Sequence, residues 1–305
     1  MTFAPFSTAA QHSANGLSLC VLLTCFNRRD QTLECLRALA GSTGLTQIAL
    51  SAVLVDDGST DGTADAVRRE LGWVRVVRST DNLYWCRGMH LAFSTAMQTG
   101  FDFYLWLNDD TILHADAIDR LIRCEAKLRR STRADVIVAG STADALTGQI
   151  SYGGERRPSR LRPLRVARLQ PASQPQRCDS MTGNIVLVSA EVARRVGNVD
   201  PTFEHSMGDT DYALRAARHD VQVWIGEGVH GTCSDNPQRN TWCDASLPLR
   251  ARWRDMNTRK GLPWRSWLTL TRRHGGLFWP LHFASPYVKV MLQSALRKRR
   301  SQASR

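Results

Sequence analysis

From Leu17 to Ile225 the chain alternates short apolar runs with stretches that have the spacing of amphipathic helices. The apolar runs predict strands at Leu19–Cys25, Ala52–Val55, Val74–Val77, Phe103–Leu107, Ile185–Val188 and Val221–Ile225. The helical patterns lie at Asp30–Leu39, Ala64–Leu71, Gly88–Met97, Ala115–Leu128, Glu191–Val196 and Asp209–His219. Such alternation predicts an α/β fold, in which helices flank both faces of a Rossmann-like, mostly parallel sheet.

Composition divides the chain into three parts. Residues 1–16 are small and polar, and we expect them to be disordered, whereas residues 17–242 should form the α/β domain. From residue 243 the sequence turns to Trp, Arg and Pro, which predicts a basic, Trp-rich, helical C-terminal extension over residues 243–305. Between Gly148 and Cys178 the periodicity is lost, so a mobile loop or a short hairpin is expected there.

The net charge of +12 and the pI of about 9.9 point to an anionic partner. Nucleic acid, an anionic membrane face and phosphorylated substrates all fit charge alone. The basic residues gather in Arg156–Arg168 and from Arg250 onward, without zinc-finger or basic-zipper spacing, so nucleic acid is the weakest of the three. Eight single cysteines without a CxxC pair, and no secretory signal, favour a reducing compartment and a cytoplasmic protein.

Two apolar segments bear on membrane association. Leu17–Phe26 is too short to span a bilayer, and prolines and a lysine interrupt Leu277–Leu292. The second segment, with the basic tail LRKRRSQASR, is expected either to be an ordinary solvated end or to attach the protein peripherally to an anionic leaflet.

Polar groups that follow the predicted strands mark the candidate site. In open parallel sheets the ligand crevice lies beyond the carboxyl ends of the strands, which selects Thr24–Arg28, Asp56–Ser59 and Asn108–Thr111. Neither GxGxxG nor a P-loop motif is present, which argues against a dinucleotide or P-loop site.

Each acidic motif allows a chemical and a structural interpretation. Asp109 and Asp110 repel unless a cation lies between them, and carboxylates suit Mg²⁺ or Mn²⁺ beside a diphosphate; alternatively they cap the next helix. Asp56 either accepts hydrogen bonds from a nucleobase or ribose or belongs to an ordinary turn. Asp209 and Asp211 open a helix, either as a general base or as common helix-start acids.

Together these motifs resemble the inverting family-2 glycosyltransferases, and the NDDT sequence is rhamnosyltransferase-like. The resemblance covers about Leu17–Gly231 and implies the GT-A fold. Five segments carry it in the family's order: SLCVLLTCFNRRDQTLECLRAL, VLVDDGSTDGTAD, TDNLYWCRGMHLAF, YLWLNDDTIL and TGNIVLVSAEVARRVGNVDPTFEHSMGDTDYALRAARHDVQVWIGEGVHG.

The resemblance also implies a role for individual residues. Those implied to bind the nucleotide-sugar are Thr24, Asn27, Arg28, Asp56, Asp57, Asn82, Arg87 and Asp109. The implied metal ligands are Asp110 first, then Asn108 and, more weakly, His230, with Mg²⁺ or Mn²⁺ as the ion. Asp209 is the implied base and Asp211 its alternative, because Gly208 replaces the usual preceding acid.

The implied function is transfer of a sugar from a UDP- or dTDP-linked donor to a hydroxyl of a glycan or lipid-linked glycan. It places the protein in polysaccharide biosynthesis at the inner face of the cell envelope. Two alternatives stay open: a catalytically degenerate glycan-binding or scaffold subunit, and a sugar-1-phosphate nucleotidyltransferase. The second needs a Gly-rich basic loop that LLTCFNRRD lacks.

Overall fold

The computed structural model describes residues 16–44, 48–80, 82–159, 161–235 and 240–303. Apart from Gly16, the predicted disorder of residues 1–16 therefore concerns residues outside the described ranges.

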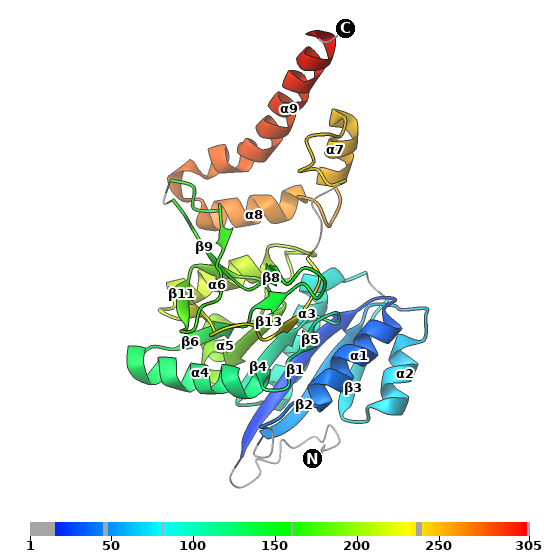
Figure 1. Ribbon diagram of the computed structural model, residues 1–305, viewed down its shortest axis with the longest axis vertical. Helices are drawn as coiled ribbons and strands as arrows, with labels where there is room; N and C mark the ends of the chain where they lie inside the picture. The colour runs from blue at the N-terminus through cyan, green and yellow to red at the C-terminus, as the bar shows by residue number, and fades with distance from the viewer. Residues whose placement is uncertain (1–15, 45–47, 81, 160, 236–239, 304–305) are drawn as a thin grey trace.

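A central sheet of eight strands, in the order β11-β14-β6-β13-β4-β1-β2-β3, confirms the α/β prediction (Figure 1). Parallel pairs join β1 to β2 and β4, β2 to β3, and β6 to β14. Strand β13 enters antiparallel between β4 and β6, and β11 lies antiparallel at the edge. The bounds are β1 Leu17–Cys25, β2 Ile48–Asp56, β3 Val74–Arg78, β4 Phe103–Leu107, β6 Val136–Ala139, β11 Gln176–Cys178, β13 Ile185–Ser189 and β14 Gln222–Ile225.

Helices cover both faces because the inner strands are apolar on both sides. In β1, Leu19, Val21 and Leu23 face one core, whereas Cys20 and Leu22 face the other. The first core is closed by α1 (Arg29–Ala40), α2 (Thr63–Glu70) and α4 (Ala117–Thr132). The second is closed by α3 (Tyr84–Thr99), α5 (Ala190–Val196) and α6 (Gly208–Arg218).

The start of α3 differs from the prediction, because the helix begins at Tyr84 rather than Gly88. The carboxylate of Asp57 accepts hydrogen bonds from the Leu83 and Tyr84 N–H groups, at 2.8 and 2.9 Å. Helix starts leave such N–H groups without partners. Asp57, which is distant in sequence, thus stabilises a first turn of α3 that the periodicity of the sequence does not indicate.

The segment from Gly148 to Cys178 contains more regular structure than the expected loop or hairpin. It supplies β8 (Ile150–Tyr152), the antiparallel pair β9 (Gly154–Arg156) and β10 (Ala167–Arg168), and the edge strand β11. Strands β9 and β10 form a small sheet with β12 (Ser180–Met181). Strand β8 joins a second small sheet with β5 (Ile112–Leu113), β7 (Thr142–Ala143) and β15 (Gly231–Thr232).

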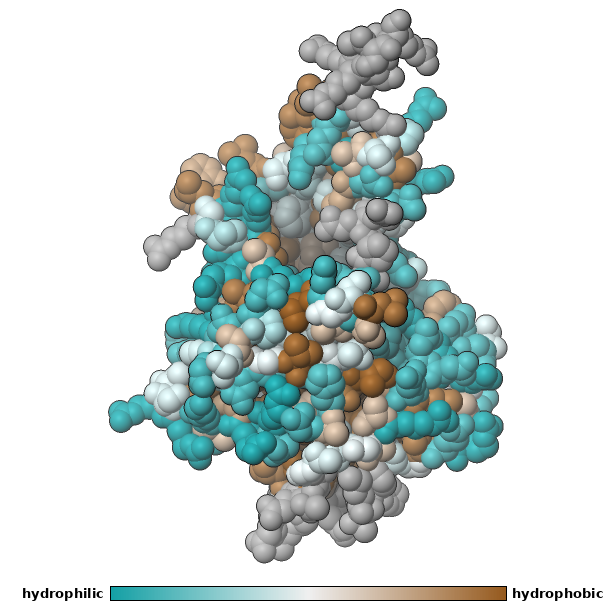
Figure 2. Space-filling model, in the orientation of Figure 1, coloured by the Kyte–Doolittle hydropathy of each residue, from teal (hydrophilic) through white to brown (hydrophobic). Residues whose placement is uncertain are grey.

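Beyond the sheets, residues 243–305 contain α7 (Leu249–Met256), α8 (Trp264–His274), a 3-10 turn at Gly276–Phe278 and α9 (Trp279–Ala303). In Figure 1 α8 lies across the body and α9 leads away from it. A small core of Met256, Leu262 and Val290 holds these helices together and packs against Met207 of the body. None of the helices in the described ranges has the length and apolarity that crossing a membrane needs. Figure 2 shows hydrophobic residues exposed on this extension.

Candidate active site

The carboxyl ends of β1 and β2 form one wall of the candidate site. Asp56 ends β2 opposite Cys25 of β1 and is fully buried. Its Oδ1 accepts a hydrogen bond from the Ser59 N–H at 2.9 Å, and the Arg78 Nε atom lies 3.9 Å from Oδ2. That Oδ2 atom has no hydrogen-bond donor among the described residues. Since buried polar atoms are normally hydrogen-bonded, Asp56 can receive an N–H or O–H group from a ligand.

Neighbouring residues predicted to bind the nucleotide shape this wall. Asn27 has a positive φ of 50°; its N–H donates to the Ser59 hydroxyl, and its Oδ1 accepts from the Thr60 N–H. These bonds fasten the loop after β1 to the turn after β2. Thr24 lies directly beneath Gly88, where an added Cβ would come within 2.4 Å of the threonine Oγ1. Asn82 is exposed, with a positive φ of 50°.

Arg28 joins this wall to the acids that follow β4. Its Nη1 atom lies 3.1 Å from Asp109 Oδ1 and 2.7 Å from Asp110 Oδ2. Burial raises the pKa of Asp109 to about 7, Arg28 opposes this shift, and the charge of Asp110 adds to it. Two carboxylates thus share one guanidinium at a buried strand end, an arrangement that still favours an additional cation.

The three residues predicted to bind the metal, Asp110, Asn108 and His230, lie in different surroundings. Asp110 lies beside Asp109, but the Asn108 Oδ1 atom accepts a hydrogen bond from Trp85 Nε1 at 2.7 Å. His230 is fully buried against Gly226, and burial lowers its pKa to about 3, with the charge of Arg120 acting in the same direction. The described residues contain no group of three or more His, Cys, Asp or Glu side chains arranged for a metal. Asp109 and Asp110 fit an ion such as Mg²⁺, which commonly takes one or two carboxylates and completes its shell with substrate phosphates and water.

The two acids of α6 have different surroundings. Asp211 is fully buried; its Oδ2 accepts from Arg215 Nε at 2.8 Å, and its Oδ1 faces His274 Nε2 at 2.9 Å and Arg273 Nη1 at 3.2 Å. Burial alone would raise its pKa, but the hydrogen bonds from His274 and Arg215 bring the pKa below its usual value. Asp211 is therefore occupied by basic side chains on both oxygens.

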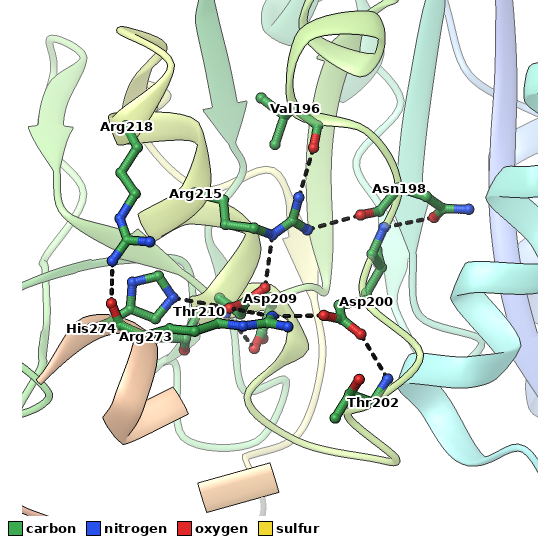
Figure 3. A network of polar contacts seen from close by, with 12 residues as sticks. Val196, Asn198, Asp200, Thr202, Asp209, Thr210, Arg215, Arg218, Arg273 and His274 are labelled. Atoms are coloured by element: carbon green, nitrogen blue, oxygen red, sulfur yellow. Dashed lines mark hydrogen bonds and ion pairs between the residues drawn. The ribbon is translucent and has the colours of Figure 1, made fainter. Parts of the chain in front are cut away.

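Asp209, in contrast, lies in a mostly buried position with some remaining solvent exposure, and backbone groups hold it. Its Oδ2 accepts from the Gly183 N–H at 3.0 Å and its Oδ1 from the Thr210 N–H at 2.8 Å. Burial raises its pKa, partly offset by these two hydrogen bonds. Figure 3 shows this region, with Asp209 beside the network that Arg273 and His274 form. Of the two acids, Asp209 is thus the one whose contacts with the described residues are backbone N–H groups, whereas basic side chains hold Asp211.

Trp85 links Asn108, the first residue after β4, to the region of Asp209, a connection that the sequence reasoning missed. Its indole N–H binds Asn108, and its ring packs on Gly183, where an added Cβ would lie 2.3 Å from Trp85 Cζ2. Gly183 in turn donates to Asp209. In the sequence, Trp85 is only the second residue of the adjacent aromatic pair Tyr84–Trp85, which by itself does not indicate this link.

Glu155 on β9 was also missed, because it lies in the segment without periodicity. Burial raises its pKa to about 7, and the charge of Asp209 adds to the shift. The charge of Asp209 thus acts on Glu155, which lies on the small sheet of β9, β10 and β12. Only the tertiary structure reveals this relationship, since the two residues are far apart in the sequence.

The loop before α6 is fastened on two sides. From α3, Arg87 Nε donates to the Pro201 carbonyl at 3.0 Å and its Nη2 lies 3.3 Å from Glu204. From the C-terminal extension, Arg259 Nε lies 2.9 Å from Glu204 and Arg273 Nη1 lies 2.6 Å from Asp200. Arg87, predicted to face the donor, is thus engaged in holding the loop that leads to Asp209.

The acidic strand ends, the Asp109–Asp110 pair and the helix that begins beside Asp209 define a protein of the GT-A glycosyltransferase fold. Residues 20–167 match the family model described as glycosyl transferase family 2. The match covers a little under half of the chain and agrees with the resemblance seen in the sequence motifs.

Solved structures share the fold. GalNAc-T7 with UDP, GalNAc and Mn²⁺ aligns with a TM-score of 0.56 at 14% identity, over 74% of this chain and 46% of that one. Mannosyltransferase PcManGT from Pyrobaculum calidifontis, in complex with GDP-Man and Mn²⁺, aligns with a TM-score of 0.53 at 15% identity, over 95% and 76%. TarS of S. aureus aligns with a TM-score of 0.50 at 13% identity, over 73% of this chain and 37% of that one. The chain thus spans less than half of the first and third of these proteins. No curated protein sequence matches it.

Proposed function

We propose that the protein transfers one sugar from a nucleotide-diphospho-sugar to a hydroxyl group of a glycan or lipid-linked glycan, with inversion at the anomeric carbon. The observation that carries the proposal is the chain of contacts that runs from Asn108, the residue before the Asp109–Asp110 pair, through Trp85 and Gly183 to Asp209. It provides a carboxylate pair for a cation and a separate base within one site. The neighbouring folds that hold UDP or GDP-Man with Mn²⁺ support the donor class.

On the donor side, Asp56 would accept hydrogen bonds from the nucleoside through its free Oδ2 atom. Asp110, with Asp109 beside it, would hold Mg²⁺ or Mn²⁺. When bound, such an ion supplies positive charge that stabilises the departing diphosphate. Arg28 already lies against both carboxylates and would shift toward the diphosphate as the ion takes its place.

On the acceptor side, Asp209 would take the proton of the attacking hydroxyl. The acceptor oxygen then forms its bond to the anomeric carbon while the bond from that carbon to the diphosphate oxygen breaks, and the electron pair leaves with the diphosphate. Asp209 suits this role because backbone N–H groups orient its carboxylate while burial raises its proton affinity. A uridine or thymidine donor, rhamnose as the sugar, and a place at the inner face of the membrane remain parts of the proposal drawn from the sequence resemblance.

The test is release of nucleoside diphosphate from a panel of UDP-, dTDP- and GDP-sugars, with and without Mn²⁺, using water and added glycans as acceptors. We expect metal-dependent turnover of one donor class. If no donor in the panel is consumed, the glycan-binding or scaffold alternative replaces the transferase.

A further inference from the structure

The C-terminal extension exposes an apolar surface that the other described residues do not cover. Leu277 is 94% exposed, Phe278 65%, Leu281 67%, Leu292 60% and Leu296 60%. They lie at the corner between α8 and α9 and along α9, where Figure 2 shows hydrophobic surface. We call these five residues, together with Val288 and Met291, the apolar stripe.

The stripe lies on the side of α9 that faces away from the extension's own core. At about 100° per residue, Leu281, Val288 and Leu292 fall within a narrow sector of the helix. Val290 is about half a turn from Leu281 and is fully buried in the core with Met256 and Leu262. Helix α9 is therefore apolar on two opposite sides. Within the described residues, one side packs in the core of the extension and the other is exposed.

The net charge of the extension indicates which kind of partner the apolar stripe would contact. Residues 243–305 contain 14 Lys and Arg and two Asp, whereas residues 1–242 contain 26 Lys and Arg and 26 Asp and Glu. The entire formal charge of +12 thus belongs to the extension. A second copy of the chain would bring like charge against like charge, whereas an anionic surface is complementary.

Arginine and tryptophan pairs add a feature typical of the membrane interface. The Arg265 guanidinium lies 5.3 Å from the centroid of the Trp264 ring, and that of Arg272 lies 5.6 Å from the Trp279 ring. Arg265 and Arg272 are exposed, as is Lys289 next to Val288 in the stripe. Indole rings sit at the headgroup level of bilayers, and basic side chains there bind anionic headgroups.

We propose that the apolar stripe and the basic residues around it dock the protein on an anionic lipid surface. The stripe enters the boundary between headgroups and acyl chains, while Arg265, Arg272 and Lys289 contact the lipid phosphates. The proposal deepens the proposed function, because it names the surface that would bring the site to a lipid-linked acceptor. It rests on that function for the acceptor alone.

The experiment is co-sedimentation of the full chain with vesicles of phosphatidylcholine, with and without phosphatidylglycerol. We expect binding only to the vesicles that contain phosphatidylglycerol, falling as salt is added. The triple variant Leu277→Ser, Phe278→Ser, Leu281→Ser should lower binding by about tenfold or more, because exposed side chains lose membrane burial without loss of core packing. Arg265→Gln and Arg272→Gln should each lower it by about fivefold.

Leu146→Ser is the matched control, since Leu146 is also 94% exposed but lies on the body of the protein. Equal binding to both vesicle types, or unchanged binding of the triple variant, would overturn the proposal. So would a dimer in solution, seen by light scattering, that the triple variant abolishes. Donor hydrolysis measured without vesicles should be unchanged in every variant, which separates a failure of docking from a failure of the proposed transferase.

Discussion

Asp209 and Asp211 lie two positions apart, yet neutralising each should have a different consequence. Asp209→Asn removes the proposed base, so donor turnover should fall by about 10²–10⁴-fold. The free energy of unfolding of the Asp209→Asn variant should be little changed, because burial already disfavours the charged form of the Asp209 carboxyl. Asp211→Asn instead leaves Arg215, Arg273 and His274 around a neutral group and should lower the free energy of unfolding by about 3 kcal/mol.

Urea unfolding and turnover measured on both variants test this assignment. Asp65→Asn is the matched control, since Asp65 is largely exposed and pairs with Arg68 at the surface. Full turnover in Asp209→Asn would contradict its role as the base. An unfolding free energy of Asp211→Asn equal to that of the wild type would contradict the structural role of Asp211.

Glu155 gives a prediction for pH. Burial and the charge of Asp209 raise its pKa from the usual 4.5 to about 7 in the folded protein. Between these values the native state holds a proton that the unfolded chain releases, so this carboxyl contributes less stability as the pH rises from about 4.5 to 7. In the Glu155→Gln variant, the free energy of unfolding should therefore decline less over this pH range. The check is the unfolding free energy of both proteins across this range; parallel curves would show that Glu155 is not the cause.

At the level of elements, the contact between α6 and α3 explains a departure from the family pattern. A Cβ added to Gly208 would lie 2.3 Å from the Cys86 sulfur, so the acid that usually precedes the base has no room at this position. Gly208→Ala should destabilise the protein by about 2 kcal/mol through overpacking. Cys86→Ala removes the clashing sulfur, so the double variant should be more stable than the two single losses added together. Simple additivity in thermal unfolding would argue against this contact.

Elements also show what the sequence could predict. Apolar runs located most strands of the large sheet, because burial on both faces leaves a local signal. The antiparallel entry of β13 and the small strands of residues 148–178 depend on partners far along the chain and leave no such signal. The motifs predict roles for Asp56, Asp109 and Asp209, but the contacts of Asp211 with Arg273 and His274, more than 60 positions away, could not be predicted from the sequence.

Considered as a whole, the molecule joins the body that holds the large sheet to a helical extension that also supports the candidate site. Arg273 and His274 of α8 bind the acids around α6, Arg259 binds Glu204, and Met207 packs on the extension's core. The extension that carries the net positive charge therefore also holds the loop and helix that present Asp209. A variant with Arg273→Gln and His274→Gln should lose both stability and turnover, because Asp211 keeps only Arg215. Unfolding and donor hydrolysis measured together test this; retention of both would contradict the coupling.

A metal-dependent nucleotide-sugar site built on Asp109 and Asp110 is central to the proposed function. Its most direct test is thermal unfolding of the wild type and of Asp110→Asn with UDP, dTDP and GDP, each with and without Mn²⁺. We predict that one nucleotide, at 100 times its dissociation constant, stabilises the wild type by about 2.7 kcal/mol only when Mn²⁺ is present. We also predict that Asp110→Asn loses most of this effect. Stabilisation by none of the nucleotides, or an equal effect without Mn²⁺ and in Asp110→Asn, would contradict a metal-dependent site.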